Sequence, residues 1–559
     1  MMEDNQVFSG YPRPQLRRNS FISLNGTWDF AQGQCKALPE IYTEKLIVPY
    51  PPQSKYSGIA RNIDDRSYLF YRRRFTLPQG FTRSRVMLHI GAADQVSDVY
   101  LNNEHILSHK GGYTSFSADL TNWLKEENEL IIRTYDDLGD KSFPYGKQKQ
   151  KRGGMWYTPV SGIWQSVWLE SVPERYVKSI EIRTSGDEVT ITAEGCQTND
   201  TLCVFTPEGT VYGDFIGNSV KIKIPNPVLW SPERPYLYNF EITANEDKVT
   251  SYFAFRTLEV KKVNGISRLC LNGEPYFFNG VLDQGYWPEG IYTPPTQESF
   301  AKDILEMKAL GFNTLRKHIK VEHELFYYEC DRLGMIVFQD MVNNGGYSFI
   351  KDTALPTVGL KRKSDKRSNR NATVRKTFLE SMKATVAQLK NHPCICMWTI
   401  FNEGWGQFDA DKCTDYLREL DSTRFIDSTS GWFKQKNSDV ESIHTYFKKF
   451  KTPKAAKPII LSEFGGYAFS VEGHLFSPGK EYGYRSFSNG QQFESALAAL
   501  YKEQIVPAVN KGLCASILTQ LSDVEDETNG LLTYDRAVLK VSKEPFLKIA
   551  AELAEQIKK

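Results

Sequence analysis

The sequence is poor in cysteine and histidine for its length. It has 559 residues, nine cysteines spread from Cys35 to Cys514, and eight histidines. The odd number of cysteines and the lack of Cys-x-x-Cys pairs beside histidines argue against a disulfide framework and a zinc site. We therefore expect reduced thiols, no metal site and a cytoplasmic location.

Long apolar runs and an excess of charge of one sign are also missing. No stretch approaches the roughly 18 consecutive apolar residues of a membrane span. The first residues lack an apolar run of about seven after a basic segment, so we expect no secretory signal. Lysine plus arginine number 69 and aspartate plus glutamate 67, a formal net charge of +2. This balance argues against nucleic acid or an anionic membrane as partner and favours a small or neutral ligand.

What the chain does have is a change of pattern along its length. Residues 20–172 consist of short alternating runs without a long amphipathic helix, which predicts a jelly-roll β-sandwich for residues 1–172. Residues 174–256 continue with strands over a length that fits an immunoglobulin-like β-sandwich, residues 173–256. Residues 257–559 hold eight short apolar runs that alternate with helical patterns, which predicts a (β/α)8 TIM barrel. The predicted fold class is multidomain, β plus α/β.

Two of the barrel runs deliver a glutamate at their carboxyl ends. WTIFN, the predicted fourth strand, is followed by Glu403, and IILSE, the predicted seventh strand, ends on Glu463. Barrel enzymes carry their chemistry at that end of the strands. Hydrolysis of a glycosidic bond needs one carboxylic acid and one carboxylate, which different surroundings keep in different protonation states. Each motif is weak alone, but the two together predict a catalytic pair.

Further motifs make the chain resemble glycoside hydrolase family 2, the family of β-galactosidases, β-glucuronidases and β-mannosidases. The likeness covers nearly the whole length, with LNGTW and YTPVSGIWQSVWLE in the predicted jelly roll and GFNTLRKHIK, DRLGMIVFQDM, FNEGWG and SEFGG in the predicted barrel. The resemblance implies the same three domains that the periodicity predicts. It also implies a retaining double displacement through a covalent glycosyl-enzyme, without an organic cofactor.

The resemblance assigns roles to individual residues. Glu403 would be the general acid/base and Glu463 the nucleophile. Asn402 would hydrogen-bond the sugar 2-hydroxyl, Tyr446 would donate to the nucleophile, and Arg316 would keep it ionised. The other predicted sugar contacts are His318, His444, Asp283, Gln520 and Trp405. For Tyr446 and the two histidines, a place in the core is the alternative.

The chain departs from the family pattern at residues that would recognise the sugar. Family glucuronidases carry an Asn-x-Lys pair near the eighth strand, but here Asn529 is followed by Gly530 and Leu531. Large galactosidases carry an aspartate before a Met-Trp pair, where this chain has Gly154. We therefore favour a neutral hexopyranoside, with a terminal β-galactoside first. A β-glucuronide, β-mannoside or α-L-arabinopyranoside is the alternative within the family, and a carbohydrate-binding protein without catalysis is the alternative outside it.

Long loops on the predicted catalytic side favour removal of one terminal sugar from a small glycoside or oligosaccharide. Residues 361–370 form a basic run, which indicates a solvated loop or a contact to an acidic leaving group or another subunit. Residues 464–490 are rich in Tyr, Phe and Gly and would form an aromatic wall. Lys147, Lys149 and Lys151 are interpreted as surface charge. The sequence leaves a homo-oligomer open.

Overall fold

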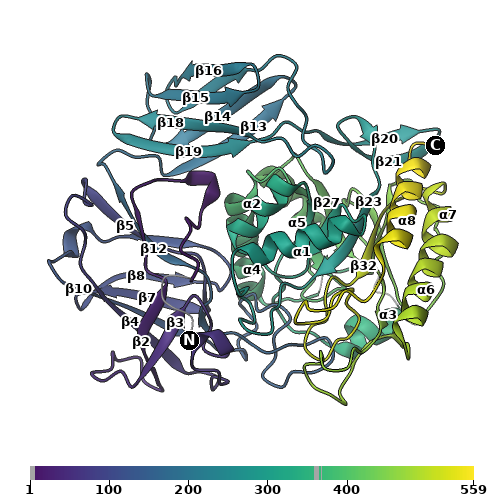
Figure 1. Cartoon of the computed structure of the whole chain (residues 1–559), viewed down its shortest axis with the longest axis horizontal. Helices are drawn as coiled ribbons and strands as arrows, with labels where there is room; N and C mark the ends of the chain where they lie inside the picture. Colours follow the sequence, from purple (N-terminus) through teal and green to yellow (C-terminus); the bar gives the residue numbers. More distant parts are fainter. Residues whose placement is uncertain (1–6, 358–359, 361–363, 367) are drawn as a thin grey trace.

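The structure, a computed structural model, describes residues 7–357, 360, 364–366 and 368–559. Two β-sandwiches precede a barrel in the chain (Figure 1). In that view the first sandwich lies beside the barrel, and the second lies across the top of both. The predicted multidomain fold class is confirmed. Of the basic run, Lys361, Arg362, Lys363 and Arg367 lie outside the described residues.

The first sandwich consists of two antiparallel sheets that share one core. Along β7 (Val96–Leu101) buried residues alternate with half-buried ones, as expected for a strand with one face inside. Val99 of β7 and Leu88 of the opposite sheet meet in the same apolar cluster. One sheet has the order β1 (Phe21–Ser23), β12 (Val167–Val172), β5 (Arg85–Ile90), β9 (Phe116–Asp119). The other has the order β3 (Glu44–Val48), β2 (Gly26–Gly33), β4 (Tyr68–Phe75), β10 (Asn128–Tyr135), β7, β8 (Glu104–Lys110).

The second sandwich is smaller and is also built on alternation. In β18 (Tyr238–Ala244) every second residue is buried, and Ile242 packs in one cluster with Ile191 of the facing sheet. One sheet has the order β13 (Ser179–Ser185), β14 (Glu188–Glu194), β17 (Ser219–Lys223). The other has the order β16 (Gly209–Asp214), β15 (Thr201–Thr206), β18, β19 (Asp247–Phe253). The chain before β1 contacts this sandwich, since Arg17 N donates to Thr250 O at 2.9 Å.

The barrel is a parallel sheet of eight strands. Their hydrogen-bonded order is β27 (Phe425–Ser430), β26 (Ile395–Asn402), β25 (Ile336–Asp340), β24 (Thr314–Lys317), β23 (Phe278–Asp283), β32 (Leu513–Thr519), β29 (Ile459–Gly465), β28 (Glu441–Thr445). The sheet closes almost completely, because Ser430 Oγ at the end of β27 lies 2.9 Å from His444 Nε2 of β28. In chain order β26 is the fourth barrel strand and β29 the seventh, as predicted from the sequence.

Helices cover the outside of the barrel between most strands. They are α1 (Glu298–Ala309), α2 (Glu324–Leu333), α4 (Ala372–Leu389), α5 (Ala410–Leu420), α6 (Gly490–Leu500), α7 (Val506–Val509) and α8 (Lys543–Gln556). A hairpin of β20 (Leu258–Val263) and β21 (Ile266–Leu271) leads into the barrel, so the predicted domain boundaries fall between β12 and β13 and between β19 and β20. None of the described helices has the length and apolar character needed to cross a membrane.

Candidate active site

Glu403 lies where β26 leaves the barrel wall. All eight residues of β26 are buried, so the chain turns only after Asn402. Glu403 itself has φ +52° and Gly404 has φ +74°, both in the left-handed region. A non-glycine residue in that region costs roughly 1–2 kcal/mol, and such strain persists where the surroundings fix it. Here the Glu403 N–H donates to Ser430 O at 2.9 Å, which holds the glutamate at the strand end.

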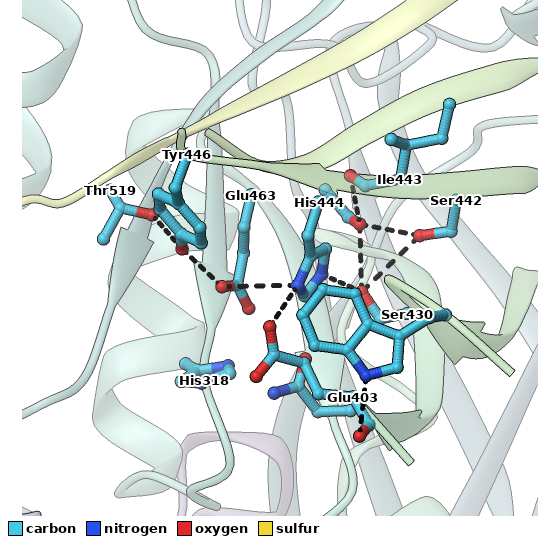
Figure 2. Close-up of polar contacts among 12 residues, drawn as sticks. His318, Glu403, Ser430, Ser442, Ile443, His444, Tyr446, Glu463 and Thr519 are labelled. Carbon is cyan, nitrogen blue, oxygen red and sulfur yellow. Dashed lines mark hydrogen bonds and ion pairs between the residues drawn. The ribbon is translucent and has the colours of Figure 1, made fainter. Parts of the chain in front are cut away.

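Glu463 lies within β29, at an irregular point of the barrel wall. The register of β29 shifts against β28 next to His444 and shifts again against β32 between Leu461 and Phe464. Such bulges re-aim a side chain and are common beside active sites. Glu463 is only 5% exposed. The carboxylate therefore projects from a fixed strand position into the site in Figure 2.

The carboxylates of the two glutamates both approach one ring nitrogen of His444, Nδ1 (Figure 2). His444 Nδ1 lies 2.9 Å from Glu403 Oε1 and 3.6 Å from Glu463 Oε2. The nearest carboxylate oxygens and a His444 nitrogen all lie within 4.8 Å of one another. Ser430 Oγ lies 2.9 Å from the other ring nitrogen, Nε2, and so helps to fix the imidazole. The structure thus brings together the predicted glutamate pair and one of the predicted histidines.

Arg316, the third residue of β24, holds Glu463 from the barrel interior. Its Nη1 donates to Glu463 Oε1 at 3.1 Å, and its Nε and Nη2 each donate to Asp340 at 3.0 Å. Burial alone would raise the pKa of Glu463, but the neighbouring charges of His444 and Arg316 outweigh it and lower that pKa. Glu463 is therefore held ionised, as a nucleophile requires.

Tyr446 binds the other oxygen of the same carboxylate. Its hydroxyl donates to Glu463 Oε2 at 2.5 Å and lies 3.0 Å from Thr519 Oγ1 at the end of β32. Burial, followed by the charge of Glu463, raises the pKa of Tyr446 well above its ordinary value. The phenol therefore stays protonated and remains a donor. Tyr446 directly follows the last residue of β28.

Asn402 and His318 extend the same network. Asn402 Oδ1 accepts from Arg316 Nη2 at 3.0 Å, which orients its amide. His318 Nδ1 lies 2.7 Å from Asp340 Oδ2, and its Nε2 is buried without a hydrogen-bond partner among the described residues. Burial, followed by the charge of Lys147, lowers the pKa of His318 to about 4. A neutral imidazole with one unused nitrogen can exchange a hydrogen bond with a sugar hydroxyl.

The three remaining predicted sugar contacts belong to other clusters. Asp283 accepts from Lys317 Nζ at 2.6 Å, within a buried ion-pair group that also includes Glu322. Trp405 packs edge-on against Trp156 of the first sandwich. Gln520 donates to Asn529 Oδ1 at 2.7 Å, and its own Oε1 is buried and has no hydrogen-bond partner in the described part of the chain. Their direct contact with sugar stays a prediction.

Sequence reasoning missed Asp340 and interpreted Lys147 only as surface charge, although both belong to the surroundings of Glu463. Asp340 clamps Arg316 and also bonds His318. A signal existed for Asp340, because it ends the apolar run MIVFQ just as Glu463 ends its own run. Lys147 comes from the first sandwich, and its charge acts on Glu463, His318 and Glu527. No sequence signal places this lysine over the barrel, because only the docking of the two domains does so.

A cavity opens beside Glu403 at the carboxyl ends of the strands. Its volume is ≈ 310 Å³. We call it the leaving-group cleft, and its lining is Thr353, Pro356, Glu403, Gly431, Trp432, Lys434, Ile443, His444, Thr445, Tyr446, Phe447, Lys448, Lys451, Pro453 and Tyr484. Tyr484 comes from the Tyr- and Phe-rich segment that was predicted to form an aromatic wall. Glu463 is not part of this lining and is less exposed than Glu403, so we distinguish an inner part of the site at Glu463 from an outer part at the cleft.

The ligand atoms of the same three side chains are also close enough together to hold a metal ion. Glu403, His444 and Glu463 each offer one ligand atom within 4.8 Å of the others. Arg316 already donates to one oxygen of Glu463 and Tyr446 to the other. A divalent cation would have to compete with these donors and lie next to a guanidinium, so the arrangement suits acid–base chemistry better than metal binding.

Family comparisons agree with the architecture. Residues 261–540 match the family described as "Glycosyl hydrolases family 2, TIM barrel domain". Residues 45–160 match "Glycosyl hydrolase 2 galactose-binding domain-like", and residues 176–256 match "Glycosyl hydrolases family 2". The three matches follow the order of the two sandwiches and the barrel.

Curated relatives carry two different names. A β-galactosidase from Thermoanaerobacter pseudethanolicus is 26% identical over 429 residues, which are 72% of this chain and 54% of that protein. The β-glucuronidase of Homo sapiens is 25% identical over 542 residues, which are 81% of this chain and 79% of that protein. Three of the curated relatives, among them the β-galactosidase, are longer than the matched region. The chain spans 54%, 58% and 65% of their length, or about half to two thirds.

Solved structures share the fold over nearly the whole chain. An uncultured Clostridium sp. β-glucuronidase aligns with a TM-score of 0.74 at 19% identity, covering 98% of this chain and 100% of that one. A β-galacturonidase from Eisenbergiella tayi aligns with a TM-score of 0.69 at 16% identity, covering 98% of both chains. At such identities the likeness concerns the fold alone.

Proposed function

The chain belongs to glycoside hydrolase family 2, and from this premise we propose that it is a retaining exo-β-glycosidase. In the first step an oxygen of Glu463 forms an ester bond to the anomeric carbon while the glycosidic bond breaks and Glu403 gives its proton to the leaving oxygen. In the second step Glu403 takes a proton from water, which attacks the same carbon and releases Glu463. One terminal sugar is freed with its β-configuration.

The observation that carries this proposal is the separation of the two carboxylates. Their nearest oxygens lie within 4.8 Å. Retaining glycosidases hold the carboxyl groups about 5–5.5 Å apart, whereas inverting enzymes leave roughly 6.5–9.5 Å for a water molecule. The contacts of Arg316 and Tyr446 further suit Glu463 to the role of nucleophile, because they stabilise its ionised form. Glu403, which opens into the leaving-group cleft, suits the role of acid/base.

For the sugar we propose a β-galactoside first. Glu527 is buried beside the inner site, where it accepts hydrogen bonds from Tyr157 and from Gln520. A carboxylate at that place accepts readily from a sugar hydroxyl and repels a sugar carboxylate. Asn529, which would stand in an Asn-x-Lys pair, accepts from Gln520 instead. These groups favour a neutral sugar.

A β-glucuronide is the second candidate. Several curated relatives are named β-glucuronidases. In addition, the charge of Lys147 is one of those that lower the pKa of Glu463 and of His318 in the inner site. This lysine would offer a cation to a sugar carboxylate from a different domain than the missing Asn-x-Lys pair.

A panel of nitrophenyl glycosides tests the proposal. It contains the β-galactoside, β-glucuronide, β-glucoside, β-mannoside and α-arabinoside, with proton NMR of the first sugar released. We expect hydrolysis of one substrate, a first product with the anomeric configuration of that substrate, and loss of turnover in the Glu463→Gln variant with the fold retained by circular dichroism. Initial release of the opposite anomer would contradict retention. Binding of sugar without hydrolysis of any glycoside would instead support a carbohydrate-binding protein.

A further inference from the structure

The leaving-group cleft carries three lysines and few acidic groups. Lys434, Lys448 and Lys451 line it, and Glu403 is the one carboxylate among its lining residues. Lys434 is neutralised by an ion pair with Glu441. In the part of the chain that the structure describes, no ion pair is recorded for Lys448 or Lys451. The cleft therefore presents two uncompensated cations next to the acid that would protonate the leaving oxygen.

The same lining also carries aromatic side chains. Tyr484 stacks on Tyr446 with ring centroids 4.0 Å apart and an interplanar angle of 10°. Phe447 packs edge-on against Tyr484 and is 68% exposed, although it is a large apolar side chain. Trp432 is fixed in the inner wall because its Nε1 donates to Glu403 O at 3.1 Å. Such rings pack against the apolar face of a pyranose or against an aromatic ring.

We propose that the leaving group of the natural substrate is a ring that carries an anionic group, a carboxylate or a sulfate. Lys448 and Lys451 bind the anion, while Phe447 and Tyr484 contact the ring. The inference rests on the proposed function, because it takes Glu403 as the acid that faces the leaving group. It concerns the outer part of the site only and holds for either candidate sugar in the inner part.

The neighbouring Lys449 provides a matched control. It is exposed, lies between the two lysines in sequence, and pairs with Glu503 at 3.9 Å. It does not belong to the lining of the leaving-group cleft. Loss of its charge therefore changes the net charge of the loop without changing the cations that face the leaving group.

The test compares two coumarin glycosides of the sugar that the panel identifies. One leaving group is 7-hydroxycoumarin-3-carboxylate and the other is its uncharged ethyl ester, so shape and chemistry are close. Each exposed ion pair is worth up to about 1 kcal/mol, or roughly fivefold, and the anion has two lysines to pair with. We expect kcat/KM to favour the carboxylate on the order of 10-fold at low salt, and the ratio to shrink in about 0.5 M NaCl because salt screens exposed charges.

Variants identify the groups responsible. The double variant K448M/K451M should bring the ratio close to one, whereas Lys449→Met should keep the wild-type ratio. A parallel pair of disaccharides, with a uronic acid or a neutral hexose at the reducing end, tells whether the anion belongs to a sugar or to an aromatic ring. Equal kcat/KM for both members of each pair, or a preference that survives K448M/K451M, would overturn the inference. Failure to hydrolyse even the neutral ester would instead contradict the proposed function.

Discussion

Glu463 is a buried carboxylate whose charge is fixed by its neighbours. Arg316 donates to one oxygen and Tyr446 to the other. Its folded-state pKa lies below the ordinary value, so the ionised form and the stability that its contacts supply are present above the ordinary value of about 4.3. Both are lost only as the pH falls through the folded-state pKa. This one carboxylate thus links activity and stability at acid pH.

Removal of the Tyr446 hydroxyl should move the acid limb of activity. In the Tyr446→Phe variant Glu463 loses a donor to its ionised form, so its pKa rises. A hydrogen bond to a charged group is worth about 1.5–3 kcal/mol, which corresponds to about one pKa unit or more. We expect the acid limb of kcat/KM to shift upward by about one pH unit. Tyr467→Phe, whose ring packs on Phe487, is the control. A lower kcat with an unmoved acid limb would contradict this role.

Loss of the Glu403 carboxyl should affect substrates according to their leaving groups. A dinitrophenolate departs without a proton, whereas a poor leaving group needs one. We therefore expect Glu403→Ala to lower kcat/KM roughly 10²–10⁴-fold on unactivated glycosides and far less on dinitrophenyl glycosides. Azide in the vacated space should attack the glycosyl-enzyme and yield the β-glycosyl azide, detected by mass spectrometry. Equal losses on both substrates without an azide adduct would contradict the assignment of Glu403.

At the scale of elements, the turn after β26 positions Glu403, the proposed acid. A Cβ added to Gly404 would lie 2.2 Å from a ring carbon of Phe433, and φ is +74°. The Gly404→Ala variant should therefore be destabilised by conformational strain of about 1–2 kcal/mol and by overpacking of about 1–3 kcal/mol. We expect a clear drop in the free energy of unfolding, measured in urea, together with lower activity.

Gly473 provides a matched control for that turn. Its φ is +82°, and a Cβ there would meet nothing within 4 Å. Gly473→Ala should therefore show the strain alone and keep wild-type activity. If Gly404→Ala were no less stable and no less active than Gly473→Ala, the packing of Phe433 against this turn would not position Glu403.

The elements were predictable to the extent that burial leaves a periodic trace. All eight barrel strands were found. Some are mostly apolar runs, as in β26, whereas more polar ones such as β28 (ESIHT) followed from their place in the alternation of strands and helices. Helix α1 was found from its spacing, and Ile304 and Met307 are fully buried. Leu305 fits the same spacing but is 51% exposed, because a 3.6-residue period does not fix the width of the buried face. The glutamates were predictable as strand ends, whereas the bulge at Glu463 depends on pairing between strands.

At the scale of the whole molecule, the first sandwich contributes the charge of Lys147 to the surroundings of Glu463, the proposed nucleophile. Its loop is fixed by backbone contacts, since Tyr157 N donates to Lys147 O at 2.9 Å. At Gly146, with φ +61°, a Cβ would lie 2.7 Å from Tyr113 Oη and 3.3 Å from Ile319 O, which follows His318 in the barrel. Because this loop lies close to the barrel, the charge of Lys147 lowers the pKa of Glu463. Sequence patterns could not reveal it, because periodicity describes each domain separately.

Replacement of Lys147 tests whether that docking matters for activity. Its charge lowers the pKa of Glu463, so Lys147→Met should raise that pKa and move the acid limb of kcat/KM upward. Lys151→Met, at an exposed position of the same loop, should leave the profile unchanged. If the sugar is a uronide, Lys147→Met should also raise KM more for the glucuronide than for the galactoside, because only the former presents a carboxylate to the lysine. Identical pH profiles and sugar preferences in the two variants would mean that the first sandwich supports the barrel without acting on its chemistry.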